Sequence, residues 1–335
     1  MTQTLNLASI YAPVTSGMES VPGIIRDILK TPNRRIEDVV RYFLSRNGKL
    51  LRPALVFLGG GLARSLSAGA PVPAEREETA ELHLAAATEI FHAATLIHDD
   101  IIDSAPIRRG LPSLHVKWGP QTAVLAGDYF HDRAVVTIFR YGNDRIIPLF
   151  LKTAGEICEG EMQELGEKNN INLTEEIHFE ILRKKTASLL ACALQTGALV
   201  WGMDEARAEA LGRYGNYFGM AFQITDDRLD FTGRENELGK TLGSDLGEGV
   251  YTLPVIRCLA SADRDKVVRI LHARNHGKRF SMLKTLLQKN GALEYALEKA
   301  KGFVSRAKAE LEGFPESPFK TSLLGLADYV IRRER

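Results

Sequence analysis

Two aspartate clusters of identical spacing constrain this sequence more than any other feature. The first is Asp99-Asp100-Ile101-Ile102-Asp103, and the second is Asp226-Asp227-Arg228-Leu229-Asp230. Each follows an apolar stretch, and residues four apart are neighbours on a helix, so the outer aspartates of each cluster share a helix face. Carboxylates are rarely buried unless they are paired or bound to a metal. The sequence therefore predicts two acidic helix faces that require a cation.

The ligand type indicates which cation. Carboxylate oxygens without Cys or His favour a hard metal, and Mg²⁺ typically keeps water and a substrate phosphate in its shell. Six aspartates facing one cavity would destabilise the fold without such ions. We therefore expect both clusters to face a common cavity and to bind Mg²⁺ as the cofactor. The expected metal ligands are Asp99, Asp100, Asp103, Asp226, Asp227 and Asp230.

Basic residues lie close in the sequence to both clusters. The turn Arg108-Arg109-Gly110 directly follows the first. A solvated loop is the usual fate of an arginine pair, but the neighbouring aspartates favour bidentate recognition of phosphate. A glycine-rich loop over 238–249 follows the second cluster, and we expect it to close over a ligand. The basic residues expected at phosphates are Lys49, Arg52, Arg108, Arg109, Lys185 and Lys240.

Helical periodicity extends over most of the chain, and alternating patterns are almost absent. This pattern predicts an all-α fold, a single large helical bundle around a central active-site cavity. We expect one domain over 1–335, with an irregular segment over 1–20. The predicted helices cover 21–46 with a break at 31–33, 75–103, 121–140, 144–166, 186–203 and 204–232, followed by three or four amphipathic helices over 252–335.

Composition excludes several classes of function. Lys and Arg total 43 against 42 Asp and Glu, so no net charge favours a nucleic-acid partner. The N-terminus lacks the pattern of a secretory signal, and the uncharged stretch over 186–203 fits a buried core helix better than an integral membrane segment. Cys158, Cys192 and Cys258 lack metal-ligand spacing, so we interpret them as buried reduced thiols of a cytoplasmic protein.

The ordered set of motifs resembles the trans-polyprenyl diphosphate synthases, in particular the long-chain octaprenyl and heptaprenyl members. Besides the two DDxxD clusters it includes Gly48-Lys49-Leu50-Leu51-Arg52-Pro53, Lys185-Thr186-Ala187, Gln223, Leu238-Gly239-Lys240 and Thr252-Leu253-Pro254. The resemblance covers nearly the whole chain. It implies the isoprenoid synthase fold, a homodimer, and a prenyltransferase that adds isopentenyl diphosphate head-to-tail to an allylic diphosphate such as farnesyl or geranylgeranyl diphosphate.

The resemblance also implies a role for each motif residue. Magnesium ions would bridge both clusters and the allylic diphosphate, with Asp99, Asp103 and Asp226 as the main ligands. Val250 replaces a lysine that the family often has, which should weaken one phosphate contact without abolishing activity. The implied catalytic residues are Asp99, Asp103, Asp226, Lys185 and Lys240. Arg108, Lys185, Thr186, Gln223 and Lys240 would bind the allylic diphosphate, and Lys49, Arg52, His92 and Arg109 would bind isopentenyl diphosphate.

Small residues one turn before the first cluster predict a long product. Ala94 and Thr95 stand where short-chain family members usually have an aromatic residue. The small residues would leave the tunnel open, and the resemblance then implies a product of about 30 to 50 carbon atoms. The floor would come from a deeper residue, for which Phe139 and Phe150 are the candidates. Such products typically become quinone side chains, and their release implies transient contact with a membrane.

Several alternatives stay open at this point. His92 precedes Asp99 by one heptad, and a ligand role and a core role are equally compatible with that position. The chain fits a catalytic subunit of a heteromeric synthase, or a shorter-chain synthase with products of about 15 to 20 carbon atoms. A terpene cyclase normally lacks the second DDxxD cluster, and a regulatory subunit normally lacks both, so we disfavour these two.

Overall fold

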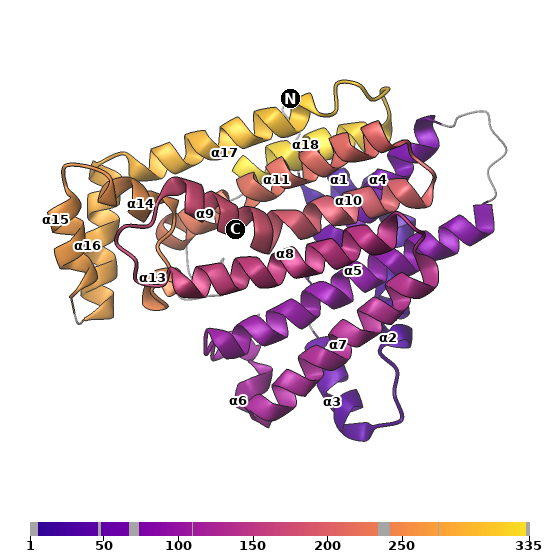
Figure 1. Ribbon diagram of the computed structural model, residues 1–335, viewed down its shortest axis with the longest axis horizontal. Helices are drawn as coiled ribbons and strands as arrows, with labels where there is room; N and C mark the ends of the chain where they lie inside the picture. Colours follow the sequence, from indigo (N-terminus) through magenta and orange to yellow (C-terminus); the bar gives the residue numbers. More distant parts are fainter. Residues whose placement is uncertain are drawn as a thin grey trace. The chain divides into compact units, whose positions relative to one another are not determined.

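The computed structural model describes residues 6–45, 48–66, 74–108, 110–233, 242–273 and 275–332. Within these ranges the chain is almost entirely α-helical, apart from one antiparallel ribbon of β1 (Ile107–Arg108) and β2 (Leu111–Pro112) (Figure 1). The expected all-α class is confirmed. The chain divides into two compact units. The first comprises Met1–Lys152, Leu189–Gly212 and Leu311–Leu326, and the second comprises Thr153–Ser188, Arg213–Glu310 and Ala327–Arg335.

The N-terminal segment is helical, so the expectation of an irregular segment over 1–20 was wrong for the described residues 6–20. The Asn6 side chain accepts a hydrogen bond from the Ser9 N–H and caps the first helix. Pro13 is the second residue of a short 3₁₀ turn, a position where its missing N–H is not needed. Helices this short show too little periodicity to be recognised. The elements are α1 (Leu7–Tyr11), η1 (Ala12–Val14) and α2 (Thr15–Ile28).

Helix α5 (Ala74–Ile102) is the centre of the first unit and contacts α2, α4 and α7 (Figure 1). Helix α10 (Ser188–Val200) approaches α4 so closely that a Cβ atom on Gly197 would lie 1.8 Å from the carbonyl oxygen of Val56. Only glycine allows this contact, which explains the uncharged, small-residue character of α10. The remaining helices here are α3 (Arg34–Phe43), α4 (Leu51–Leu66), α6 (Leu114–Trp118) and α7 (Pro120–Tyr141).

The second unit is built around the side of α11 that carries Met220 and Ile224. These residues pack against Leu182 before η2 and Leu253 of α14. Thr174 caps α9, because its hydroxyl accepts a hydrogen bond from the Ile177 N–H. The elements are α8 (Ile146–Gly166), α9 (Glu175–Leu182), η2 (Arg183–Ala187), α11 (Glu205–Thr232) and α13 (Ser244–Gly247), and α8 and α11 also contribute residues to the first unit.

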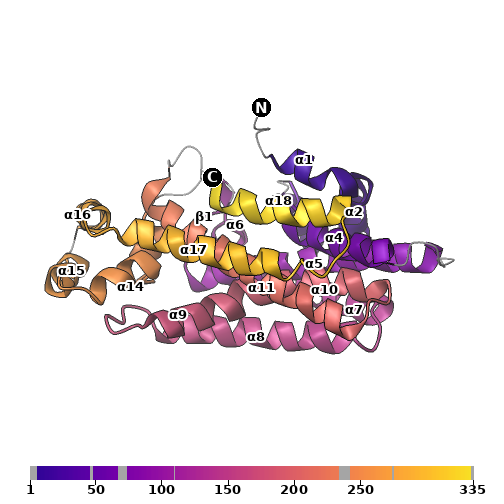
Figure 2. The same cartoon turned by 90° about the horizontal axis from the view of Figure 1, so that it is seen from above.

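Five helices, rather than three or four, occupy the described residues after 252. Figure 2 shows α15 and α16 beside each other next to α14 and α17. The sequence pattern indicated fewer helices, because elements as short as α14 and α15, with seven and eight residues, show little periodicity. The helices are α14 (Leu253–Leu259), α15 (Arg264–Leu271), α16 (His276–Lys289), α17 (Ala292–Ala309) and α18 (Pro318–Arg332).

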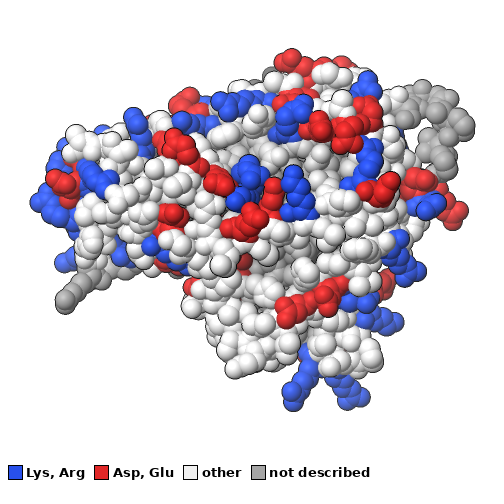
Figure 3. All heavy atoms as spheres, viewed as in Figure 1, with Lys and Arg blue, Asp and Glu red and all other residues white. Residues whose placement is uncertain are grey.

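The surface and the cysteines agree in part with the expectations from composition. Acidic and basic side chains are interspersed on the face seen in Figure 3, as a net charge of +1 suggests. Among the described residues, we find no helix long and apolar enough to cross a membrane. All three cysteines are described, and none of them forms a disulfide bond. Cys192 and Cys258 are buried, but Cys158 is exposed, so its expected burial was wrong.

Candidate active site

The first aspartate motif lies at the C-terminal end of α5. The Asp103 N–H donates to the Asp99 carbonyl at 2.8 Å, so helical geometry continues through the motif and the two carboxylates share a face. Asp99 and Asp103 are both partly exposed, whereas Asp100 is only 4% exposed. The motif therefore presents its outer carboxylates and buries its middle one.

Asp100 is paired with Arg108, which the ribbon after α5 brings back to the helix. Arg108 Nε and Nη2 donate to the same Asp100 oxygen, Oδ1, at 2.7 and 2.5 Å. The turn is fixed by the Ala105 N–H, which donates to the Asp100 carbonyl, and by the Ser113 hydroxyl, which donates to the Ala105 carbonyl. Arg108 thus has a defined position beside the motif. Arg109 lies outside the described residues.

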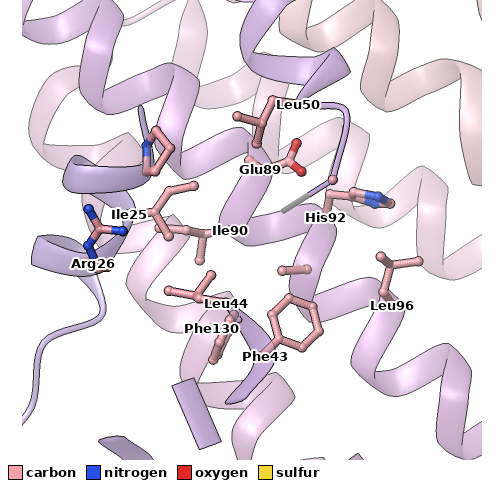
Figure 4. Close-up of a pocket in the computed structure, with 13 residues that line it drawn as sticks. Ile25, Arg26, Phe43, Leu44, Leu50, Glu89, Ile90, His92, Leu96 and Phe130 are labelled. Carbon is pink, nitrogen blue, oxygen red and sulfur yellow. The ribbon is translucent and has the colours of Figure 1, made fainter. Parts of the chain in front are cut away.

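His92 lines a pocket of the first unit, seven residues before Asp99 on α5. Figure 4 shows His92 and Glu89 on the side of this pocket where Leu50 lies, with apolar side chains of α2, α3, α5 and α7 opposite. Leu50 has a positive φ of 49°, an uncommon conformation for a non-glycine residue that often marks functional segments. Its neighbours Lys49 and Arg52 are exposed and half-buried, respectively. The cavity measures about 50 Å³, too small by itself for an isoprenoid diphosphate.

The residues expected to control product length differ in burial. Ala94 is 1% exposed, and the Thr95 hydroxyl donates to the His92 carbonyl at 2.9 Å. Phe150 is also 1% exposed and contacts Phe91 of α5 edge to face, with 4.9 Å between ring centroids. Phe139 is 54% exposed on α7. Phe150 is therefore better suited than Phe139 to form the closed end of a product tunnel within one chain.

The second aspartate motif lies near the C-terminal end of α11, in the second unit. Asp226 is partly exposed, whereas Asp227 and Asp230 are 3% and 0% exposed. Gln223 Nε2 donates to Asp227 Oδ1 at 2.9 Å, and the Thr186 hydroxyl donates to Gln223 Oε1 at 3.2 Å. The structure therefore joins three residues that the sequence placed in one site.

Lys185 and Thr186 lie in η2, a π-helical turn between α9 and α10. Such turns are rare and are frequently found at functional sites. Lys185 Nζ lies 2.8 Å from Glu161 and 2.5 Å from Glu164, two residues of α8 that our sequence analysis did not assign. Burial alone would lower the pKa of Lys185, but the carboxylates of Glu164 and Glu161 raise it well above its usual value. The ammonium therefore stays charged at neutral pH.

A glycine makes the contact between α8 and η2 possible. A Cβ atom on Gly160 would lie 2.8 Å from Lys184 Cβ and 2.9 Å from the Lys185 backbone nitrogen. The signal that our sequence analysis missed was this glycine between two glutamates, over 159–161. The other lysine expected here, Lys240, lies outside the described residues.

The donor set of each motif suits a hard divalent cation. In the described parts of the chain, no three His, Cys, Asp or Glu side chains converge as a complete metal site. The partly exposed side chains, Asp99 and Asp103 in one motif and Asp226 in the other, offer only carboxylate oxygens. Such incomplete oxygen sets fit Mg²⁺ or Ca²⁺, whose remaining positions are commonly taken by water and phosphate.

An all-α fold that carries two aspartate-rich helix ends, each beside basic side chains, defines an isoprenoid synthase. The chain belongs to the polyprenyl synthetase family, which matches residues 33–288. It is therefore a trans-prenyl diphosphate synthase, a prenyltransferase of a family that uses a divalent metal and binds isopentenyl and allylic diphosphates. The expected family, fold and enzyme class are confirmed.

Relatives of this chain differ in the product that their names state. It is 36% identical over 300 residues to the short chain isoprenyl diphosphate synthase of Methanothermobacter thermautotrophicus, covering 88% of this chain and 89% of that protein. It is 30% identical to the octaprenyl diphosphate synthase of Escherichia coli, covering 99% and 100%. A crystal structure of polyprenyl synthase from Caulobacter crescentus, complexed with calcium and isoprenyl diphosphate, matches with a TM-score of 0.89, 32% identity and 98% of both chains.

The contact at Gly160 yields a stability prediction with a control on the same helix. Gly160→Ala should lower the free energy of unfolding by about 1–3 kcal/mol, because the methyl group must push α8 away from η2. A methyl group added at Gly155 would meet no atom within 4 Å, and Gly155 is not buried. Gly155→Ala should therefore raise the free energy of unfolding by about 0.5–1 kcal/mol, because alanine favours the helix. Urea unfolding of both variants measures the difference, and equal stabilities would refute the close packing of α8 on η2.

Proposed function

We propose that this chain is a Mg²⁺-dependent synthase of a long-chain all-trans polyprenyl diphosphate. It would add isopentenyl diphosphate to farnesyl or geranylgeranyl diphosphate until the product reaches about 30 to 50 carbon atoms. The observation that supports this product length is Ala94, a small residue that is 1% exposed and lies one turn before the first motif. Use of the product for quinone side chains, its release at a membrane surface, and a cytoplasmic location of the enzyme are parts of this proposal.

The charged residues of each motif suit the binding of an allylic diphosphate. Arg108 is oriented by Asp100, and Lys185 directs two of its three N–H donors at Glu161 and Glu164. The third N–H of Lys185 is suited to a diphosphate oxygen, and Thr186, whose hydroxyl donates to Gln223 Oε1, would contribute to the same site through the second N–H of Gln223 Nε2. Because Lys185 stays protonated, we assign it to binding of the diphosphate leaving group and not to removal of a proton.

The reaction needs charge stabilisation more than proton transfer by a side chain. Bound Mg²⁺ would stabilise the negative charge that develops on the departing diphosphate. The C–O bond of the allylic substrate breaks, and the isopentenyl double bond forms the new C–C bond with the allylic cation. The released diphosphate then accepts the proton lost from the product cation. Asp99, Asp103 and Asp226 are the residues that we propose as the main metal ligands, with Asp100, Asp227 and Asp230 supporting them. Sharing of ions by the two motifs stays a prediction.

The second substrate is assigned to the segment before α4. We propose that Lys49, Arg52 and His92 bind the diphosphate of isopentenyl diphosphate; the strained Leu50 and the position of His92 beside it support this assignment. Arg109 and Lys240 keep the roles that the sequence resemblance implies. Val250, in place of a lysine, leaves one cation fewer for phosphate.

Activity is tested with the purified chain, Mg²⁺, farnesyl diphosphate and labelled isopentenyl diphosphate. We expect extended products, and none after chelation of the metal. Asp99→Ala should lower kcat by about a hundredfold or more, because a ligand to the charge-stabilising ion is lost. Asp144→Ala is the control, because Asp144 is exposed in the turn before α8. Lack of product with the chain alone, and its appearance with a second subunit, would favour the heteromeric alternative.

Product length is tested by filling or emptying the space beside α5. Ala94→Tyr should shorten the product to about 15 to 20 carbon atoms, since an aromatic ring would block the tunnel. Phe150→Ala should lengthen the product, whereas Phe139→Ala should leave it unchanged because Phe139 is 54% exposed. Chromatography of the dephosphorylated products separates these outcomes. An unchanged length in Ala94→Tyr would refute the tunnel assignment.

We propose a homodimer that uses the exposed apolar side of α7. Leu125, Val136 and Phe139 are 68%, 55% and 54% exposed. Their spacing of eleven and three residues places them on one helix face. In Figure 3 the surface over α6 is largely uncharged, and acidic side chains lie over the middle of α7. Exposed apolar side chains that share a helix face are typical of interaction sites, and a second copy of this chain is the partner that the family resemblance implies.

Light scattering after gel filtration tests this interface. The unmodified chain should have the mass of two chains, and Leu125→Glu should have the mass of one, because a charge in an apolar interface must be desolvated. Met282→Glu is the matched control, since Met282 is 53% exposed on α16. A monomeric unmodified chain, or a Leu125→Glu variant that stays dimeric, would contradict the proposal.

A further inference from the structure

A buried histidine of α9 lies against the middle aspartate of the second motif. His178 Nε2 is 3.5 Å from Asp227 Oδ2, and the two side chains are 5% and 4% exposed. Neither atom has a hydrogen-bond partner of good geometry among the described residues. A nitrogen and a carboxylate oxygen withdrawn from water this close together are stable only when a proton lies between them. We therefore assign Nε2 as the protonated, donating nitrogen of His178.

The other oxygen of Asp227 continues this contact toward the proposed diphosphate site. Asp227 Oδ1 accepts from Gln223 Nε2 at 2.9 Å, and Gln223 Oε1 accepts from the Thr186 hydroxyl at 3.2 Å. A carboxamide has one donating end and one accepting end, so the position of Asp227 decides which end faces Thr186. The four side chains form one series of contacts from α9 through α11 to η2.

Asp226 and Asp227 differ in burial, and this difference suits them to different roles. Consecutive residues of a helix point about 100° apart, so the two carboxylates face different surroundings. Asp226 is partly exposed, and Asp227 is 3% exposed and directed at His178 and Gln223. A carboxylate that contacts a different side chain with each of its two oxygens is suited to fixing the orientation of both side chains.

We propose that His178 is a positioning residue for the allylic diphosphate. It holds Asp227 in place, Asp227 accepts one N–H of Gln223 Nε2 while Thr186 fixes the accepting end of that amide, and the second N–H of Nε2 is thereby oriented to donate to the diphosphate. The inference rests on the proposed function. It also gives Asp227 a role in orientation, in addition to the supporting role in metal binding that the motif implies.

The test compares two replacements of His178 that have similar volumes. His178→Gln keeps an N–H donor at the end of the side chain, and His178→Leu has none. In the presence of Mg²⁺, His178→Leu should bind a non-hydrolysable thio analogue of farnesyl diphosphate roughly tenfold more weakly, and its KM for farnesyl diphosphate should rise by a similar factor. His178→Gln should remain within about twofold of the unmodified chain in both, and the KM for isopentenyl diphosphate should change in neither.

A double-mutant cycle tests whether His178 acts through Gln223. In a Gln223→Leu background, His178→Leu should weaken binding of the thio analogue by less than about twofold, because the amide to be oriented is gone. Calorimetry measures the binding, and circular dichroism checks that each variant is folded; His178→Met replaces His178→Leu if the latter unfolds. Equal binding by the Gln and Leu variants, or additive effects in the cycle, would overturn the inference. Failure of the unmodified chain to form product would instead overturn the proposed function.

Discussion

The pairing of the buried middle carboxylate with neighbouring side chains is the interaction on which each aspartate motif depends. Asp100 is held by Arg108, and Asp227 by Gln223 and His178. A buried carboxylate without such a partner would cost several kcal/mol, so each pair fixes both of its members. The aspartates of each motif therefore have different roles. The middle aspartate orients other side chains, and the first aspartate remains accessible to ligands.

The electrostatics around Lys185 explain why a diphosphate would need an accompanying cation there. Glu161 and Glu164 both contact the single ammonium, so the three groups together carry one net negative charge. The carboxylates keep the lysine protonated and in place, but they also repel an anionic substrate at short range. A divalent ion bound with the diphosphate offsets that repulsion, in agreement with the family's use of a divalent metal.

Sequence periodicity identified the long helices and the motif residues, because apolar spacing and capping side chains are local signals. It placed α5, α7, α8 and α11 within a few residues of their observed bounds. It missed the π-turn and the partners Glu161 and His178, since contacts between distant segments leave no periodic trace in one sequence. It also left Phe139 and Phe150 unranked, because their burial depends on packing that helix spacing alone does not define.

The π-turn η2 has a consequence for the length of the chain at this point. Each residue added to or removed from a helix rotates everything beyond it by about 100°. Between Leu182 and Ser188, the wider turn sets the direction in which Lys185 and Thr186 project relative to α9. Loss of a single residue there would restore a regular helix and turn these side chains away from Glu164 and Gln223. The roles proposed for Lys185 and Thr186 therefore depend on the number of residues in this segment as well as on the identity of the two side chains.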